Sequence, residues 1–293
     1  MRLGYLASAV GAALWGTGPV IAKNLQIGGV AMNAYRWLMI GACVFALDAA
    51  RGRPLTTHAM RITIVPGAVI GLNVSLFFSA ARETSVVNAT IINSLHPIVV
   101  AVIATRFLGE RIRMRAALWG ALALAATIVV ILGEPADGVN SAWGDLLAAG
   151  SAVSFAFVFI ASQRARQQLP TTTYLTATAL WAAAVSAVLA LLIGQDLSWP
   201  VGSDWGGLLL LVAVPGLLGT ALVFWSVGTI PVWISSSLAL LVPVFAAVTA
   251  WIALGESMTV AQMVAMLVAV GALIGLVHAS DAPAATASSA HVT

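Results

Sequence analysis

The stretch LHPIVVAVIATRFLGE at residues 95–110 is echoed by LVPVFAAVTAWIALGE at residues 241–256. The two stretches align without a gap at an offset of 146 residues (95 to 241), and both contain an early proline and end in Leu-Gly-Glu. Matches between alanines and leucines are common among apolar segments. A proline and a Leu-Gly-Glu at one fixed spacing are much rarer by chance, so the chain contains an internal repeat.

The composition around these stretches is that of a membrane protein. Of the 293 residues, 61% are hydrophobic and 8% are charged, whereas soluble domains carry about 25% charged residues. So few charges cannot cover a water-facing surface, and lipid is the solvent that suits such a chain. The net charge of +3 gives no basic stripe, so no nucleic-acid partner is expected.

Ten apolar segments approach the roughly 20 residues that a helix needs to cross the bilayer core. Most connectors are short and hold nearly all of the charge. The sequence therefore predicts an all-α integral membrane protein. The expected spans are Leu3–Ala22, Ala31–Leu47, Ile62–Ala81, Val86–Thr105, Ala116–Gly133, Leu146–Gln163, Tyr174–Gly194, Trp205–Val227, Trp233–Leu254 and Val260–Val277.

The repeat divides these spans into two sets of five. The quoted stretches lie in spans 4 and 9, and a weaker echo relates Pro66-Gly67 in span 3 to Pro215-Gly216 in span 8. Because five is an odd number, the second set is inverted in the membrane relative to the first, as in many secondary transporters. We expect inverted five-helix repeats at residues 1–137 and 138–279, followed by a disordered tail at 280–293.

The arginines predict the orientation of the chain. With the N-terminus in the cytoplasm, the outside loops carry Lys23 and Arg82, and the other basic loop residues lie inside. We expect a multi-pass protein of the cell membrane (inner or plasma membrane) with both termini in the cytoplasm. The basic residues placed inside are Arg2, Arg51, Arg53, Arg61, Arg111, Arg113, Arg115, Arg164 and Arg166.

Together these features resemble the EamA-type transporters of the drug/metabolite transporter superfamily. The resemblance covers roughly residues 5–278, and Trp15-Gly16, Arg36 within Ala-Tyr-Arg-Trp and the segment 80–85 also fit it. Members carry amino acids, sugars, nucleotide-linked metabolites and drugs. The resemblance implies a secondary active transporter of a small metabolite working by alternating access, with efflux of an amino acid or related compound as the default.

His96 and Asn93 are the leading candidates for contact with the solute. His96 lies halfway along an uncharged span, where lipid satisfies neither its donor nor its acceptor. Pro97 removes a backbone hydrogen bond beside it and frees a carbonyl near Asn93, and Pro243 is expected to kink span 9. Imidazole titrates near neutral pH, so protons are candidate co-substrates. The alternative is a histidine that only hydrogen-bonds between helices.

Three charged residues are candidates for gating. A charge at the bilayer centre costs about 2.5–3.5 kcal/mol on insertion scales, so Arg36 in span 2 must face protein, water or an anion. We favour a structural or gating role for Arg36 over binding of a substrate carboxylate or phosphate. Glu110 and Glu256 end spans 4 and 9; a gate or a coupling carboxylate is the functional interpretation, and a boundary role is preferred.

Four further residues are candidate lining for a solute cavity, with ordinary packing as the alternative. Asn73 and Phe77 share a face of span 3, Trp15 lies in span 1, and Trp225 is the repeat counterpart of Phe78.

Two rival functions are weaker. An intramembrane enzyme would need a catalytic set, and the sequence contains no His-Glu-x-x-His, no Gly-rich phosphate loop and no convincing Ser/His/Asp set. A channel or scaffold protein is the second rival, but no polar stripe or filter segment repeats along the spans. No cofactor and no metal are expected. The expected partners are a small-molecule solute and the lipid bilayer, and the chain is a monomer or a homodimer.

Overall fold

The computed structural model describes residues 2–23, 25–84, 86–133, 141–202, 204–255 and 257–281. Within these residues the regular elements are all helices, and ten candidate spans are long and apolar enough to cross a membrane. The prediction of an all-α protein with ten spans is therefore confirmed. The predicted boundary at 137/138 lies outside the described residues and stays a prediction.

The first half of the chain supplies spans 1 to 5. Span 1 consists of α1 (Arg2–Gly16) and α2 (Gly18–Lys23), span 2 of α3 (Gly29–Ala50), span 3 of α4 (Thr57–Glu83), span 4 of α5 (Val86–Asn93) and α6 (His96–Phe107), and span 5 of α7 (Met114–Leu132).

The second half supplies spans 6 to 10. Span 6 is α8 (Ala142–Arg166), span 7 is α9 (Thr171–Leu192), span 8 joins α10 (Asp204–Leu211), the π-helix η1 (Val212–Gly219) and α11 (Thr220–Val227), span 9 joins α12 (Val232–Leu238) and α13 (Leu241–Leu254), and span 10 is α14 (Val260–Asp281). The last helix thus enters the segment that we expected to be disordered from residue 280, and residues 282–293 of that segment lie outside the described residues.

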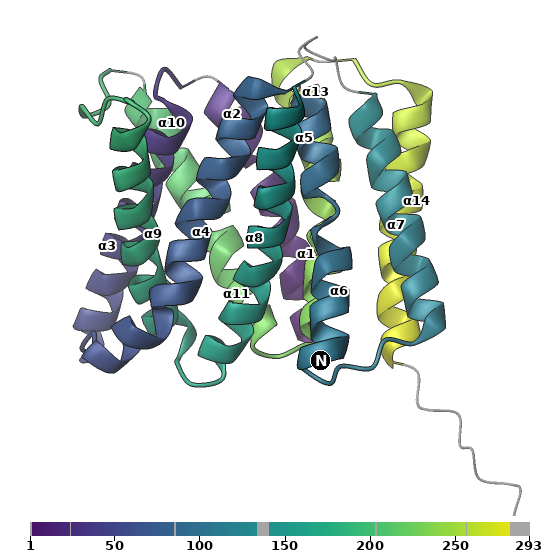
Figure 1. The fold of residues 1–293 in the computed structure, drawn as a ribbon, viewed down its shortest axis with the longest axis horizontal. Coiled ribbons are helices and arrows are strands. Elements are labelled where there is room, and N and C mark those ends of the chain that lie inside the picture. The colour runs from purple at the N-terminus through teal and green to yellow at the C-terminus, as the bar shows by residue number, and fades with distance from the viewer. Residues whose placement is uncertain are drawn as a thin grey trace, which may run out of the picture.

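The packed helix pairs reflect two related halves. Helix α4 packs along α8, and its repeat counterpart α11 packs along α1. Likewise α5 and α6 contact α8, while α12 and α13 contact α1. Helices α3 and α9 pack together at one end of the molecule and α7 and α14 at the other (Figure 1), and α4 also packs along α9. Most of these pairs have a counterpart when the halves are exchanged, although the contact of α4 with α9 is larger than that of η1 with α3; the two inverted five-helix repeats stay a prediction.

Spans 4 and 9 are interrupted at corresponding places. Helix α5 ends at Asn93 and α6 begins at His96, while α12 ends at Leu238 and α13 begins at Leu241. Each break directly precedes a proline, Pro97 or Pro243, which cannot donate a backbone hydrogen bond. Irregular backbone at membrane depth is tolerated where it is buried in protein or lines a cavity. The breaks therefore indicate the part of the molecule in which a binding site is expected.

Candidate functional site between the two halves

The break in span 4 positions His96 against the break in span 9. Its imidazole is 3% exposed. The Nδ1 atom lies 2.9 Å from the backbone oxygen of Asn93, and Nε2 lies 3.2 Å from the backbone oxygen of Ser236 in α12. The carbonyl at Asn93 that Pro97 deprives of a helical partner is thus close to the histidine itself. One side chain therefore links the broken helices of the two halves.

The two partners of His96 are both acceptors. A neutral imidazole carries one N–H and donates to one carbonyl, whereas an imidazolium donates to both. Both contacts are therefore complete hydrogen bonds only when the ring carries a second proton. A neutral ring that carries its proton on Nε2 keeps the bond between the halves, to Ser236, and leaves the contact with Asn93 without a proton.

Two aromatic rings of the second half contact His96, and a chain of ring contacts extends from them to Trp15 in the first half and to further rings of the second half. Phe155 and Phe159 of α8 lie 4.5 and 6.0 Å from the imidazole, centroid to centroid, and the Phe159 ring is nearly parallel to it at 7°. Trp15 of α1 lies 6.2 Å from Phe155 and 6.4 Å from Phe224 of α11. Tyr174 of α9 meets Phe224 edge-on at 5.3 Å. We call Trp15, Phe155, Phe159, Tyr174 and Phe224 the aromatic cluster.

Two asparagines meet on a serine beside this cluster. Asn73 Nδ2 donates to the backbone oxygen of Ser151 at 2.8 Å, and Asn93 Nδ2 donates to the Ser151 hydroxyl at 2.6 Å. Ser151 lies one turn before Phe155 on α8, so the amides and the rings occupy one face of that helix. Asn73, Asn93, His96 and Trp15 are thus placed around one region, as candidates for a common site would be.

Two candidate residues lie apart from the aromatic cluster. Phe77 makes an edge-on contact with Phe78 at 6.0 Å and packs against a small cluster around Ala80. Trp225 is half-buried, and among the described rings it has no aromatic neighbour, since its predecessor Phe224 points into the cluster instead. In this turn of span 8, Phe224 contacts Trp15 and Tyr174, and a role for Trp225 in lining a cavity stays a prediction.

Sequence reasoning missed Ser151, Phe155 and Phe159. They are spaced four residues apart on α8, which places them on one face of the helix. That spacing is a signal available in the sequence, but aromatic residues in membrane helices are common packing residues. Only the approach of His96 from another span distinguishes these two rings from the others.

Glu110 lies in the connection from α6 to α7, and Figure 1 shows this connection at the end of the molecule that carries the start of α1. One carboxylate oxygen accepts from the backbone N–H of Val232 at 3.0 Å, and the other accepts from that of Trp233 at 3.5 Å. Gln163 of α8 also donates to the carboxylate at 3.3 Å. The end of span 4 thus caps the beginning of span 9. Glu256 lies outside the described residues.

Arg36 lies in α3 with its guanidinium carbon 5.2 Å from the ring centroid of Trp37. Its Nε is buried and has no hydrogen-bond partner, and Arg36 forms no ion pair with any described residue. The indole N–H of Trp37 is likewise buried and unpartnered. No neighbouring helix within the described residues therefore holds this arginine.

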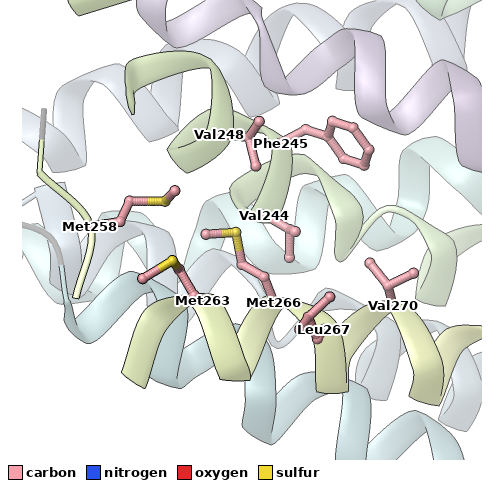
Figure 2. A pocket seen from close by; sticks show the side chains of 8 residues that line it. All are labelled: Val244, Phe245, Val248, Met258, Met263, Met266, Leu267 and Val270. Carbon is pink, nitrogen blue, oxygen red and sulfur yellow. The ribbon is translucent and has the colours of Figure 1, made fainter. Parts of the chain in front are cut away.

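An apolar pocket of about 380 Å³ lies between α13 and α14. The side chains around it carry carbon and sulfur atoms but no nitrogen or oxygen (Figure 2). Leu267 at this pocket is 75% exposed, so in a bilayer the pocket faces lipid. It offers no hydrogen bond to a polar solute, and the candidate site remains the region around His96.

Comparison with known proteins adds three findings. The sequence profile of the EamA-like transporter family matches residues 2–132 and 142–278. The aromatic amino acid exporter YddG of Ancylobacter novellus is 34% identical over 157 residues, and the match spans about half of each protein, 52% of this chain and 52% of the exporter. A protein of known crystal structure superposes with a TM-score of 0.80 at 23% identity, over 95% of this chain and 99% of its own, which shows a shared fold.

Proposed function

The chain belongs to the EamA-like transporter family, and from that membership we propose that it is a secondary transporter that exports an aromatic or related amino acid across the cell membrane. The solute passes between the two halves, which alternately open the site to either side. The chain releases the solute chemically unchanged, so it is not an enzyme.

The observation that carries this proposal is the junction of the two broken spans. At that junction the first half contributes His96 and Asn93, the second half contributes Phe155 and Phe159, and the backbone is irregular on both sides. Inverted-repeat transporters bind solutes near the midplane at such discontinuous helices. A cluster of aromatic rings suits an aromatic side chain, because offset and edge-on ring contacts add about 0.5–1.5 kcal/mol beyond area burial.

His96 and Asn93 are the proposed polar contacts of the solute. In this state both are engaged, Asn93 with Ser151 and His96 with two carbonyls. An amino-acid ammonium or amide-like group that enters between the halves would exchange with these internal partners. Such exchange makes the site sensitive to the separation of the halves, which is what alternating access requires.

Glu110 is the proposed latch on one side of the site. Its carboxylate satisfies backbone N–H groups at the beginning of α12 and is placed where the helix dipole favours a negative charge. While these bonds persist, span 4 and span 9 remain joined at that end. Opening to this side requires that they break, and the mobile element is the α12 segment relative to α6.

Protons are the proposed coupling ion, with His96 as the carrier. A second proton on the ring completes whichever of the two contacts, with Ser236 or with Asn93, lacks one, whereas a charge at this depth is costly. The proton changes the strength of contacts that alter when the halves separate. Protonation and the separation of the halves are therefore linked. His96→Gln, which keeps hydrogen bonding but cannot carry the proton, is expected to retain counterflow while losing the response to a pH gradient.

Counterflow in proteoliposomes tests the proposed transport. Vesicles loaded with unlabelled phenylalanine are expected to accumulate labelled phenylalanine transiently and saturably, and glucose, which has neither an aromatic ring nor a carboxylate, is the control solute. Equal leakage of both solutes, without saturation, would identify a channel. Absence of any protein-dependent movement across a panel of amino acids would refute the proposed solute class.

The proposed orientation has both termini in the cytoplasm. In a Cys43→Ala background, cysteines introduced at Arg53 and at Val201, both exposed, are expected to react with an impermeant thiol reagent from opposite sides. Labelling of both from the outside of intact cells would contradict the topology.

A further inference from the structure

Arg36 has no partner that would explain its place in the membrane. It is seven residues into α3, and seven residues of helix rise about 10 Å. Snorkelling to the interface would carry the guanidinium toward water, yet its Nε is enclosed. The neighbouring Tyr35 does reach the interface, where its hydroxyl donates to the backbone oxygen of Ser198 at 2.8 Å.

The face of α3 that carries Arg36 is directed toward both halves. Gly29 and Ile40, two turns before Arg36 and one turn after it, share this face. A Cβ added to Gly29 would lie 2.8 Å from Phe78 of α4, and one added to Gly216 of η1 would lie 2.9 Å from Ile40. Leu38, on the opposite face, is 45% exposed. These neighbours place Arg36, which is half-buried, near the boundary between spans 3 and 8.

The groups around the guanidinium are suited to binding an anion. The Trp37 ring lies beside the cation at 5.2 Å, which stabilises a desolvated charge without occupying its hydrogen-bond donors. Two N–H groups, Arg36 Nε and Trp37 Nε1, are buried and unpartnered. Buried donors without acceptors are costly, because each loses its bond to water without replacement. A structural lock between helices would supply acceptors for these groups, and among the described residues neither group is bonded to one; the Oδ1 of Asn33, one turn before Arg36, is itself buried without a donor.

We propose that Arg36 binds the carboxylate of the transported solute. This inference rests on the proposed function, and it reverses the structural or gating role that the sequence favours. The planar guanidinium accepts two carboxylate oxygens in parallel. The carboxylate neutralises the buried charge, and the side chain of the solute extends from this point between the halves.

The test compares phenylalanine with phenylalaninamide, which differs in lacking the carboxylate. Binding is measured on the purified chain as the ligand concentration that gives half-maximal thermal stabilisation. The chain is expected to bind phenylalanine at least tenfold more tightly than the amide, since a hydrogen bond to a charged group contributes about 1.5–3 kcal/mol. In Arg36→Gln the two ligands are expected to bind within about twofold of each other, and the exposed Arg53→Gln keeps the original preference.

Several outcomes overturn the inference and leave the proposed function intact. One is equal binding of phenylalanine and the amide by the unmodified chain. This measurement tests the inference even if the Arg36→Gln variant does not fold. Another is an equal loss of both ligands in Arg36→Gln. A third is dependence on lipid: if the effect of Arg36→Gln on phenylalanine counterflow appears only in vesicles that contain phosphatidylglycerol and vanishes in phosphatidylcholine alone, the anion is a lipid headgroup. Failure of the unmodified chain to bind any amino acid refutes the proposed function instead.

Discussion

Spans 4 and 9 share the same backbone architecture but carry different side chains at the break. Each is a helix broken just before a proline, and each ends in Leu-Gly-Glu. At the break, however, span 4 carries Asn93 and His96, whereas the matching positions of span 9 carry Ala239 and Val242. Span 9 offers backbone there, through the carbonyl of Ser236.

This difference separates the features that form the shared framework from the residues that are proposed to contact the solute. A feature that both copies need, such as the break itself, is present twice, so it belongs to the moving framework. The buried imidazole and the half-buried amide are present once and lie at the meeting point of the copies. We infer that the repeat supplies the motion and that the first half supplies the polar contacts, which gives predictions that treat each position against its counterpart.

The largest expected effect is at His96. His96→Ala removes contacts to two carbonyls and to the Phe155 and Phe159 rings, and phenylalanine counterflow is expected to fall about tenfold to a hundredfold. Val242→Ala, its repeat counterpart, removes only apolar contact and is expected to stay within about threefold of the original rate.

Protein yield and monodispersity in detergent are the control for both variants. A His96→Ala protein that is produced well but transports poorly supports a role in the site. Equal losses in His96→Ala and Val242→Ala would mean that the two breaks are equivalent and that the histidine is a packing residue.

An intermediate effect is expected at Glu110. Glu110→Gln keeps the shape of the side chain but removes the charge that faces the N-terminus of α12, weakening the latch by about 1.5 kcal/mol. The side of the molecule that contains Glu110 is then expected to open about tenfold more often. The reaction rate of a cysteine at Ser237, buried in α12, measures this opening in a Cys43→Ala background. A rate unchanged by Glu110→Gln would leave Glu110 with a boundary role.

The smallest effect is expected at Asn93. Asn93→Ala removes the amide that donates to Ser151 in this structure and that is proposed to bond the solute instead. One neutral hydrogen bond contributes about 1 kcal/mol, so the half-saturating phenylalanine concentration in counterflow is expected to rise about fivefold. Ser94→Ala is the matched control, because the Ser94 hydroxyl donates to Thr90 within its own helix at 2.8 Å. A larger change in Ser94→Ala than in Asn93→Ala would contradict the assignment.

The fold was predictable because membrane helices have a strong signature in sequence. Uninterrupted apolar runs, such as the one that corresponds to α7, predicted the spans. The proline and the Leu-Gly-Glu at a fixed spacing indicated the repeat. The boundaries were less predictable: α4 extends five residues before the expected start at Ile62, because a helix continues past the hydrocarbon core until a cap such as Thr56 ends it.

The site was predictable only in part. His96, Asn93 and Asn73 were identifiable because a polar side chain in an apolar span needs a partner. The partners themselves were not identifiable: Ser151, Phe155 and Phe159 are ordinary residues in their own helix, and their significance comes from the approach of a helix from the other half. For Arg36 the sequence favoured a structural partner, and the described residues contain none.

The most direct test of the account is protection of the junction by the solute. In a Cys43→Ala background, single cysteines replace Asn93 in span 4 and Val242 in span 9, both half-buried, and their reaction rates with a small thiol reagent are measured with and without phenylalanine. At a concentration ten times the dissociation constant, phenylalanine is expected to slow labelling of the cysteine at 93 about tenfold. The cysteine at 242 is expected to change by less than about twofold. Equal protection at both positions, or none at 93, would contradict the claim that the first half supplies the polar contacts to the solute.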